Sequence, residues 1–251
     1  MVGALVGVGG AALLGAAGYQ SMAPTGQWYG RTFIGLPRGS KQIALTYDDG
    51  PNDPHTLRLL EVLARHDVPA TFFFIGRYVQ RRPQVVRDVA RARHAIGNHT
   101  FTHPHLVVSP AIETRNQLEE CQRALEDAAG EAPRLFRPPF GGRRPVTLRI
   151  ARSLGLEPVL WNVTGWDWKN PPAEKIVENC VRQIRGGDVV LLHDGSHRAL
   201  GADRSQTVVA TERLIERYKS EGYEFVTIPQ MMANLEVSGQ PSALGHLGED
   251  L

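Results

Sequence analysis

IALTYDDGPN, residues 43–52, joins an apolar, strand-like run to two adjacent carboxylates and then to a turn. Asp, Gly, Pro and Asn all favour turns, so the stretch is compatible with nothing more than the end of a strand. However, adjacent side chains at a strand end point in different directions. Asp48 and Asp49 could therefore divide two tasks, with one carboxylate binding a metal and the other accepting a proton. Partners elsewhere in the chain must decide between these alternatives.

Strand-like and helical patterns alternate from about residue 40 to residue 235. Apolar side chains at helical spacing predict amphipathic helices over residues 56–66 and 112–128. Seven short apolar runs predict strands: QIALTYDD (42–49), ATFFFIG (70–76), HAIGNHT (94–100), LFRPPFG (135–141), EPVLWNV (157–163), DVVLLHD (188–194) and YEFVTI (223–228). Seven strand-then-helix units in series indicate an α/β fold with a parallel sheet covered by helices, and this number favours closure into a barrel.

The composition is that of an ordinary globular protein. The 251 residues are 42% hydrophobic, which is enough to bury a full core. The 28 basic and 26 acidic residues give a net charge of +2, without the basic stripe expected of a nucleic-acid-binding protein. Cys121 and Cys180 are far apart and have no C-x-x-C spacing, so they predict neither a zinc knuckle nor a redox pair.

The two ends of the chain differ in composition from its middle. The first 18 residues carry no charged side chain, which is typical of an export signal or a membrane anchor, with a disordered leader as the alternative. Pro24 should hinder cleavage after the small residues before it, which slightly favours an uncleaved anchor. We divide the chain into an apolar segment (1–23), a linker (24–39), a catalytic domain (40–235) and a flexible tail (236–251).

This division predicts where the protein works. We expect an extracytoplasmic protein, membrane-anchored or secreted, with membrane contact through residues 1–18, although a cytoplasmic location stays open. We also expect a chain that begins near Gln27 to be soluble and fully active.

Polar side chains gather at the carboxyl ends of the predicted strands. They are Asp48, Asp49, Asn98, His99, Arg137, Asp167, His193 and Asp194. In a parallel barrel these strand ends share one rim, where active sites are built. Residues that served only as turn formers would be scattered over the loops at both ends.

The sequence NHTFTH places His99 and His103 four residues apart. On one helical turn this spacing puts both imidazoles on the same side, where two histidines can share one metal. H-x-x-x-H alone is a weak signal, but a carboxylate from another strand end would complete a site of two nitrogens and one oxygen. Such a site leaves a coordination position open for water, which suits catalysis better than structural support.

Three further residues at the predicted rim could tune this chemistry. The guanidinium of Arg137 could hold a carboxylate with two hydrogen bonds and keep it ionised. Asp167 lies between two indoles in W-D-W, and His193 ends the run V-V-L-L-H. A single histidine after a strand is usually structural, so a catalytic role for His193 depends on its companions.

Five motifs follow one another along the chain: T-Y-D-D-G-P (46–51), H-T-F-T-H (99–103), R-P-P-F-G (137–141), W-D-W (166–168) and V-V-L-L-H (189–193). In these motifs the chain resembles the polysaccharide deacetylases with a NodB homology domain, carbohydrate esterase family 4. The resemblance covers roughly residues 40–230. It implies a distorted (β/α)7–8 barrel.

The resemblance implies a role for each matching residue. Asp49, His99 and His103 would bind one divalent metal, commonly zinc, for which Co²⁺ or a similar ion could substitute. Asp48 matches the family's catalytic base, and Arg137 matches the arginine that orients that base. The adjacent aspartates would then divide metal binding and proton transfer between them.

Further matches concern the acid and the acetyl group. His193 matches the catalytic acid, and Asp167 matches the carboxylate paired with it. The backbone N–H of Phe140 would stabilise negative charge on the former carbonyl oxygen. Trp168 and Leu191 match positions that wall an acetyl-sized pocket.

The chain departs from the family pattern at two positions. Thr164 stands where the fourth motif often has an acidic residue, which puts the tuning of His193 in question, and Phe140 stands where tyrosine is common. We expect His55, His105 and His197 to be ordinary loop residues, although they are close to the motifs in sequence.

The leading function is metal-dependent N-deacetylation of a GlcNAc-containing glycan, such as peptidoglycan or a chitin-like oligosaccharide. O-deacetylation of a polymer such as acetylxylan is an alternative, because the same attack by water cleaves an ester more readily than an amide. A non-catalytic, membrane-tethered glycan-binding domain would be expected to lack the base or a metal ligand, and neither is missing here. A two-metal phosphodiesterase would need further bridging carboxylates, for which the sequence offers no candidates.

Overall fold

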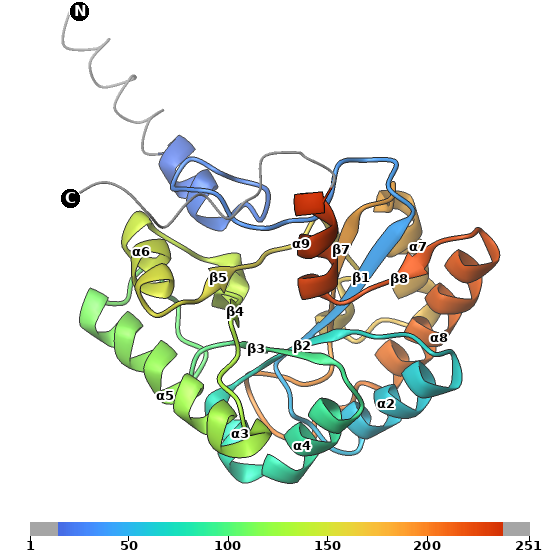
Figure 1. Cartoon of the computed structure of the whole chain (residues 1–251), viewed down its shortest axis with the longest axis horizontal. Helices are drawn as coiled ribbons and strands as arrows, with labels where there is room; N and C mark the ends of the chain where they lie inside the picture. Colours follow the sequence, from blue (N-terminus) through green and yellow to red (C-terminus); the bar gives the residue numbers. More distant parts are fainter. Residues whose placement is uncertain (1–14, 238–251) are drawn as a thin grey trace, which may run out of the picture.

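Eight strands form one curled parallel sheet in the computed structural model, which describes residues 15–237 (Figure 1). The strands are β1 (Gln42–Asp48), β2 (Thr71–Phe74), β3 (Ala95–Asn98), β4 (Leu135–Phe136), β5 (Glu157–Pro158), β6 (Val163–Thr164), β7 (Asp188–His193) and β8 (Glu224–Phe225). Their order is β5-β4-β3-β2-β1-β7-β6, and β8 pairs with β1. Each of these pairings is parallel, and the predicted distorted barrel is confirmed.

Helices cover the outside of this sheet, except α9 (Ile228–Val237), which packs with Ala44 on its inner face (Figure 1). The helices are α2 (His55–Arg65), α3 (Gly76–Arg81), α4 (Pro83–Arg91), α5 (Ala111–Ala129), α6 (Pro145–Ser153), α7 (Ala173–Gln183), α8 (Ser205–Ser220) and α9. Two short 3₁₀ helices, η1 (Pro139–Gly141) and η2 (Asp167–Lys169), lie in loops. The predicted helices over 56–66 and 112–128 are confirmed as α2 and α5.

Strand β1 is buried on both faces, which explains its unbroken apolar run. Ile43, Leu45 and Tyr47 pack into the core beneath the outer helices, and the Tyr47 ring stacks on Phe72 with centroids 5.0 Å apart. Ala44 packs on the opposite face. This central strand carries Asp48 to the rim at its carboxyl end, where the side chain stays buried.

The prediction of one strand over EPVLWNV (157–163) is wrong. β5 ends at Pro158 and β6 begins at Val163, and the two strands lie at opposite ends of the sheet order. The residues between them cross the opening of the barrel: Leu160 N–H donates to Phe33 O (2.8 Å), and Asn162 N–H donates to Val189 O (3.3 Å). Because this segment first bonds residue 33 and then β7, it cannot form one continuous strand.

The predicted linker (24–39) packs against the barrel instead of hanging free of it. Phe33 forms a bridge with Val159, and Gly35 forms one with Asp188, so the segment lies across the opening between β5 and β7. Residues 15–22, just before it, are helical. The domain boundaries themselves stay predictions.

The ends of the predicted division fall largely outside the described residues. Residues 1–14 of the apolar segment and residues 238–251 of the tail lie beyond them. Between residues 15 and 237, no helix is both long and apolar enough to cross a membrane. Cys121 and Cys180 are free and buried in the core.

Candidate active site

The rim predicted from sequence is present at the carboxyl ends of the strands. Asp48 ends β1, His193 ends β7, and strand register places these two residues opposite one another. Asn98 ends β3, and Arg137 follows β4 directly. Parallel pairing therefore brings together side chains that are far apart in the sequence.

Three potential metal ligands form a buried cluster at this rim. Asp49, His99 and His103 present ligand atoms that all lie within 4.8 Å of one another. Asp49 Oδ1 lies 3.2 Å from His103 Nε2 and 3.6 Å from His99 Nε2. The three predicted ligands are thus assembled in one place.

The protonation of these groups fits a cation. His99 Nδ1 lies 2.7 Å from the carbonyl oxygen of Arg137, which can only accept, so Nδ1 carries the proton and Nε2 presents a lone pair to the cluster. Burial, with His99 nearby, lowers the pKa of His103 to about 2 and keeps its ring neutral. Asp49 Oδ1 is buried and accepts no hydrogen bond from the described residues. The three ligand atoms lie close enough together for one divalent metal to bind all of them.

A second cluster among the described residues is a weaker candidate. His66, Glu212 and Glu216 also bring ligand atoms together, but they lie nearer the surface. Glu212 is already paired with Arg65 at 2.6 Å. Acidic groups in such exposed pairs are common without a metal, so the buried cluster is the better metal site.

The histidine pair does not lie on a helix, and that expectation is wrong. His99 and His103 lie in a loop directly after β3, where Thr100 and His103 adopt positive φ angles of 65°. Asn98 Oδ1 accepts from Thr100 N–H (2.9 Å), and Thr100 Oγ1 accepts from His103 N–H (3.1 Å). These hydrogen bonds fold the chain back on itself, which brings the two rings to 4.9 Å.

Arg137 fixes one oxygen of Asp48. Its Nη1 lies 2.8 Å from Asp48 Oδ1 and also donates to Thr46 Oγ1 (2.7 Å). The predicted two-bond grip on the carboxylate is wrong, because Nη2 and Nε donate instead to the carbonyls of Leu160 and Val159. Asp48 Oδ2 is left facing the metal cluster, 3.7 Å from His99 Nε2.

Asp167 holds His193 and favours its charged form. His193 Nδ1 lies 2.9 Å from Asp167 Oδ1, and Asp167 Oδ2 accepts from His193 N–H (2.7 Å) and from the Thr207 hydroxyl (2.9 Å). Burial lowers the pKa of His193, but the charge and hydrogen bond of Asp167, together with the charges of Asp49 and Asp48, outweigh burial and raise this pKa to about 9. A bound dication would oppose the shift, because it repels the imidazolium.

The remaining predicted residues lie around these groups. The Trp168 ring lies 5.5 Å from that of His193 and is 43% exposed, whereas Leu191 is buried in β7. Phe140 is exposed in η1, with a φ of 58°. The hydroxyl of Thr164 accepts from Trp166 N–H (3.3 Å), so it supports the W-D-W turn.

Two histidines that we expected to be ordinary loop residues belong to the site. His197 N–H donates to Asp49 Oδ2 (3.1 Å), and its ring stacks on His103 at 4.5 Å. The His105 ring stacks on Phe140 at 4.1 Å. Sequence gave no signal for His197, because it contacts a residue 148 positions away. His55 instead begins α2, 3.5 Å from Asp203.

Sequence reasoning also missed how the loops after β1 and β7 lock together. The Asn52 amide donates to Asp194 O (2.9 Å), and the Thr56 hydroxyl bonds the Asp194 carboxylate. Burial raises the pKa of Asp194 to about 7. A Cβ on Gly50 would lie 2.1 Å from Asp194 Oδ2, so the turn has no room for a side chain there. The letters G-P-N after the aspartates were the available signal.

Comparison with known proteins agrees with these motifs. The sequence model of the polysaccharide deacetylase family matches residues 35–159. A peptidoglycan-N-acetylglucosamine deacetylase of Bacillus cereus is 39% identical over 202 residues, which cover 78% of this chain and 91% of that protein.

The chain belongs to the polysaccharide deacetylase family.

Other family members are similarly related. A chitooligosaccharide deacetylase of Sinorhizobium fredii is 38% identical over 80% of this chain and 97% of its own length. The solved structure of a peptidoglycan N-acetylglucosamine deacetylase, in complex with an N-hydroxybenzamide derivative, superposes with a TM-score of 0.75 at 35% identity, covering 80% of this chain and 91% of that one.

The fold alone does not decide whether a family member is active. A wild-type carbohydrate esterase family 4 pseudoenzyme from Bacillus anthracis superposes with a TM-score of 0.74 at 29% identity, covering 80% of this chain and 68% of that one. Activity of this polysaccharide deacetylase family member must therefore be argued from its own side chains.

Backbone strain is concentrated around the candidate site of this family member. Asp49, Thr100, His103, Phe140 and Trp166 all have positive φ angles between 52° and 74°. Such angles are uncommon for residues other than glycine and persist only where the surroundings impose them. The rim is thus held in a specific shape by its packing.

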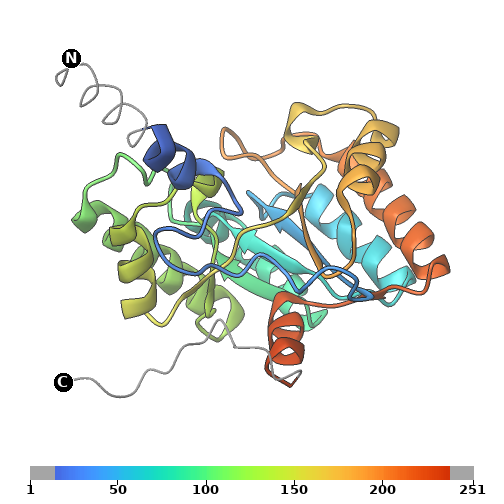
Figure 2. The same cartoon turned by 90° about the horizontal axis from the view of Figure 1, so that it is seen from above.

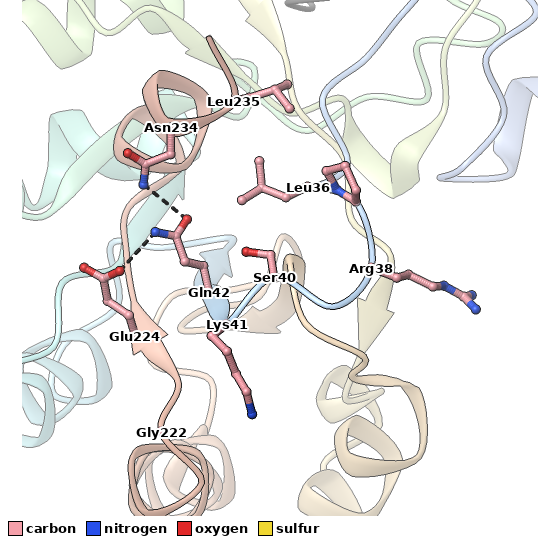
Figure 3. A pocket seen from close by; sticks show the side chains of 10 residues that line it. Leu36, Arg38, Ser40, Lys41, Gln42, Gly222, Glu224, Asn234 and Leu235 are labelled. Carbon is pink, nitrogen blue, oxygen red and sulfur yellow. Dashed lines mark hydrogen bonds between the residues drawn. The ribbon is translucent and has the colours of Figure 1, made fainter. Parts of the chain in front are cut away.

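An open pocket of about 650 Å³ lies at the other end of the sheet (Figure 3). Gln42 and Glu224, at the amino ends of β1 and β8, line it together with Asn234. These polar side chains bond one another: Gln42 donates to Glu224 (3.0 Å) and accepts from Asn234 (3.2 Å). The pocket is therefore separate from the rim chemistry.

Proposed function

We propose that this protein is a metal-dependent hydrolase that removes N-acetyl groups from a GlcNAc-containing glycan and releases acetate. The observation that carries the proposal is the geometry of two carboxylates: Asp49 lies between two histidines, whereas Asp48 has one oxygen held by Arg137 and the other turned toward the same cluster. The printed names of the relatives, which act on peptidoglycan or chitooligosaccharides, support this class of substrate.

Asp49, His99 and His103 would hold the metal, with zinc as the proposed ion. When bound, a divalent metal supplies a Lewis acid that acidifies water and polarises a carbonyl group. The backbone N–H of His197 would hold the second oxygen of Asp49 and so fix the direction of this ligand.

Asp48 would act as the base. Its Oδ2 is turned toward the cluster while Oδ1 is fixed by Arg137, so one oxygen is free to take a proton from the attacking water. Arg137 is fully buried and has hydrogen-bond acceptors for Nη1, Nη2 and Nε, which makes it a rigid support for the base.

His193 would act as the acid for the leaving amine. With a pKa of about 9 its ring is protonated at neutral pH, and the bond from Nδ1 to Asp167 leaves Nε2–H as the donor. The N–H of Phe140 would stabilise the charge that develops on the acetyl oxygen, and Trp168 and Leu191 would wall the acetyl pocket.

O-deacetylation is the second candidate, because one superposable structure is named a family 4 carbohydrate esterase, from Streptomyces lividans, in complex with acetate. We further propose that the protein works outside the cytoplasm, where peptidoglycan or an external glycan is accessible. The apolar composition of residues 1–18 supports export.

Acetate release tests the proposal across peptidoglycan, chitooligosaccharides and acetylxylan, with and without a chelator. We expect chelator-sensitive release from one of the GlcNAc substrates, restored by zinc or cobalt. The matched control is Asp48→Asn, which keeps the metal ligands. Release from acetylxylan alone would favour the esterase, and no release from any substrate by the zinc-loaded protein would favour a non-catalytic glycan-binding domain.

A further inference from the structure

Arg143 is a buried cation whose charged group is bonded to backbone carbonyls. The residue is 1% exposed. Its guanidinium donates to Gly141 O (3.0 Å), to Ala23 O (2.9 Å) and to Gly26 O, and its backbone N–H donates to Ser21 O (2.9 Å). Burying a cation costs free energy unless its N–H donors have hydrogen-bond acceptors. Arg143 can therefore stay buried only while these carbonyls accept its hydrogen bonds.

These carbonyls come from two separate parts of the chain. Ser21, Ala23 and Gly26 belong to the segment that precedes the barrel, at and beyond the end of the helical residues 15–22. Backbone carbonyls at a helix carboxyl end attract a cation. Gly141 belongs instead to η1, next to Phe140. Arg143 therefore joins the early segment to the loop that carries Phe140.

The two glycines after Phe140 are closely surrounded, and Met22 of the early segment is one of their neighbours. A Cβ on Gly142 would lie 3.1 Å from Val107 Cγ2 and 3.5 Å from Met22 Sδ. A Cβ on Gly141 would lie 3.1 Å from the Trp161 ring. Since Phe140 has a φ of 58°, its loop needs such close packing to keep this shape.

The early segment is itself fixed to the molecule. The Tyr29 hydroxyl donates to Ala17 O (2.8 Å), and Gln27 Oε1 accepts from Thr32 N–H (2.8 Å). Phe33 N–H donates to Pro158 O (2.9 Å). The first two bonds lie within the segment and the third joins it to the end of β5; Figure 2 shows the segment, in blue, lying along the green and yellow part of the chain.

We infer that residues 21–33 brace the Phe140 loop and that Arg143 is the positioning residue which transmits this support. The inference rests on the proposed function only where it assigns the Phe140 N–H to the reaction. It also reverses one expectation: a chain that begins near Gln27 lacks the carbonyls of Ser21, Ala23 and Gly26, so we expect it to be impaired instead of fully active.

The test compares Arg143→Met with Arg152→Met in the full chain. Arg152 is a matched control, because it is exposed and bonds Arg31 O in the same early segment without touching the Phe140 loop. Three quantities are measured: amide hydrogen exchange of a peptide covering residues 137–143, zinc affinity by calorimetry, and kcat and KM for acetate release.

In Arg143→Met we expect faster amide exchange in the peptide 137–143. We also expect kcat to fall about 10-fold or more, which is less than the ~10²-fold fall typical when an oxyanion donor is removed completely. Zinc affinity and KM should change less than about 3-fold, because the substitution alters neither the metal ligands nor the contacts that bind the substrate before the reaction. Arg152→Met should behave like the wild type. Arg143→Lys keeps the charge and should give intermediate exchange and kcat; it carries the test if Arg143→Met does not fold.

The inference is overturned if exchange in residues 137–143 is unchanged, if kcat is unchanged despite faster exchange, or if Arg152→Met loses as much kcat as Arg143→Met. A parallel loss of zinc affinity would also overturn it, because Arg143 would then support the site in general. If the wild type releases no acetate, the proposed function fails, whereas unchanged exchange rejects the brace independently of activity.

Discussion

At the scale of single residues, the adjacent aspartates differ because their neighbours differ. Asp49 faces His99 and His103, whereas Asp48 is bonded to a buried arginine. Two identical side chains, one position apart, therefore have different surroundings, which supports the different tasks proposed for them. Because the surroundings of the two aspartates differ, each can be tested by its own substitution.

Asp49→Asn should weaken zinc binding strongly, because an amide oxygen carries no charge and one ligand of three is lost. Asp48→Asn should retain zinc affinity and lose turnover by roughly 10²- to 10⁴-fold, the usual contribution of a general base. Calorimetric zinc titration and acetate release separate the two. Equal loss of zinc in both variants would show that the roles are misassigned.

Asp167→Asn should move the alkaline limb of the pH–rate profile to lower pH. In the wild type Asp167 makes the largest contribution to the raised pKa of His193, so the acid form persists to higher pH than in a histidine without this partner. Without the Asp167 carboxylate, burial lowers this pKa against only the weaker charges of Asp49 and Asp48. Profiles of kcat at fixed zinc occupancy measure the shift. If the alkaline limb of the pH–rate profile does not move, the pKa that it reports belongs to a group other than His193.

The same pair links pH to stability. A histidine whose pKa is raised on folding stabilises the folded state fully below its unfolded pKa of about 6.5, and this contribution disappears as the pH rises through about 9. Asp167→Asn should therefore lose more stability near neutral pH than above pH 9.

At the scale of elements, the loops after β1 and β7 act as one unit. Strand register sets Asp48 opposite His193, and Asn52 and Thr56 then bond Asp194 in the neighbouring loop. The proposed base and acid are therefore positioned by the same contact between loops. At Gly50 this contact leaves no room for a Cβ.

Gly50→Ala should destabilise the protein by about 1–3 kcal/mol, the usual cost of overpacking, because the new Cβ would lie 2.1 Å from Asp194 Oδ2. Gly18→Ala is the control, since a Cβ there meets nothing within 4 Å and residue 18 is helical. Chemical denaturation compares the two free energies of unfolding. A neutral Gly50→Ala would mean that the loops separate easily.

At the scale of the whole molecule, the site depends on the curl of the sheet. The candidate metal ligands and their supports come from the loops after β1, β3, β4 and β7, and the segment before β1 crosses the opening between the ends of the sheet. A metal that joins these distant loops should therefore stabilise the entire fold.

Zinc at about 100 times its dissociation constant should add about 2.7 kcal/mol to the free energy of unfolding, provided that the unfolded chain does not bind it. Thermal unfolding with and without zinc measures this gain. The gain should vanish in Asp49→Asn and persist in His66→Ala, which removes a residue of the other cluster. Loss of the gain in His66→Ala alone would place the metal at the surface cluster.

Much of the fold and the residues of the candidate site followed from sequence. Buried parallel strands need continuous apolar runs, and the polar residues that end such runs must share one rim, so the barrel and the group of Asp48, Asp49, Arg137 and His193 could be predicted. The ordered motifs supplied the family. These are local signals, carried by periodicity and by neighbouring residue types.

Other features depended on the path of the chain. The turn that unites His99 and His103, the contact of His197 with Asp49, and the junction made by Arg143 all require loops whose backbone angles follow no period. The last two join residues 148 and 120 positions apart. Only tertiary structure decides such contacts, because packing of distant segments, and not local preference, provides the free energy that holds each loop in its strained conformation.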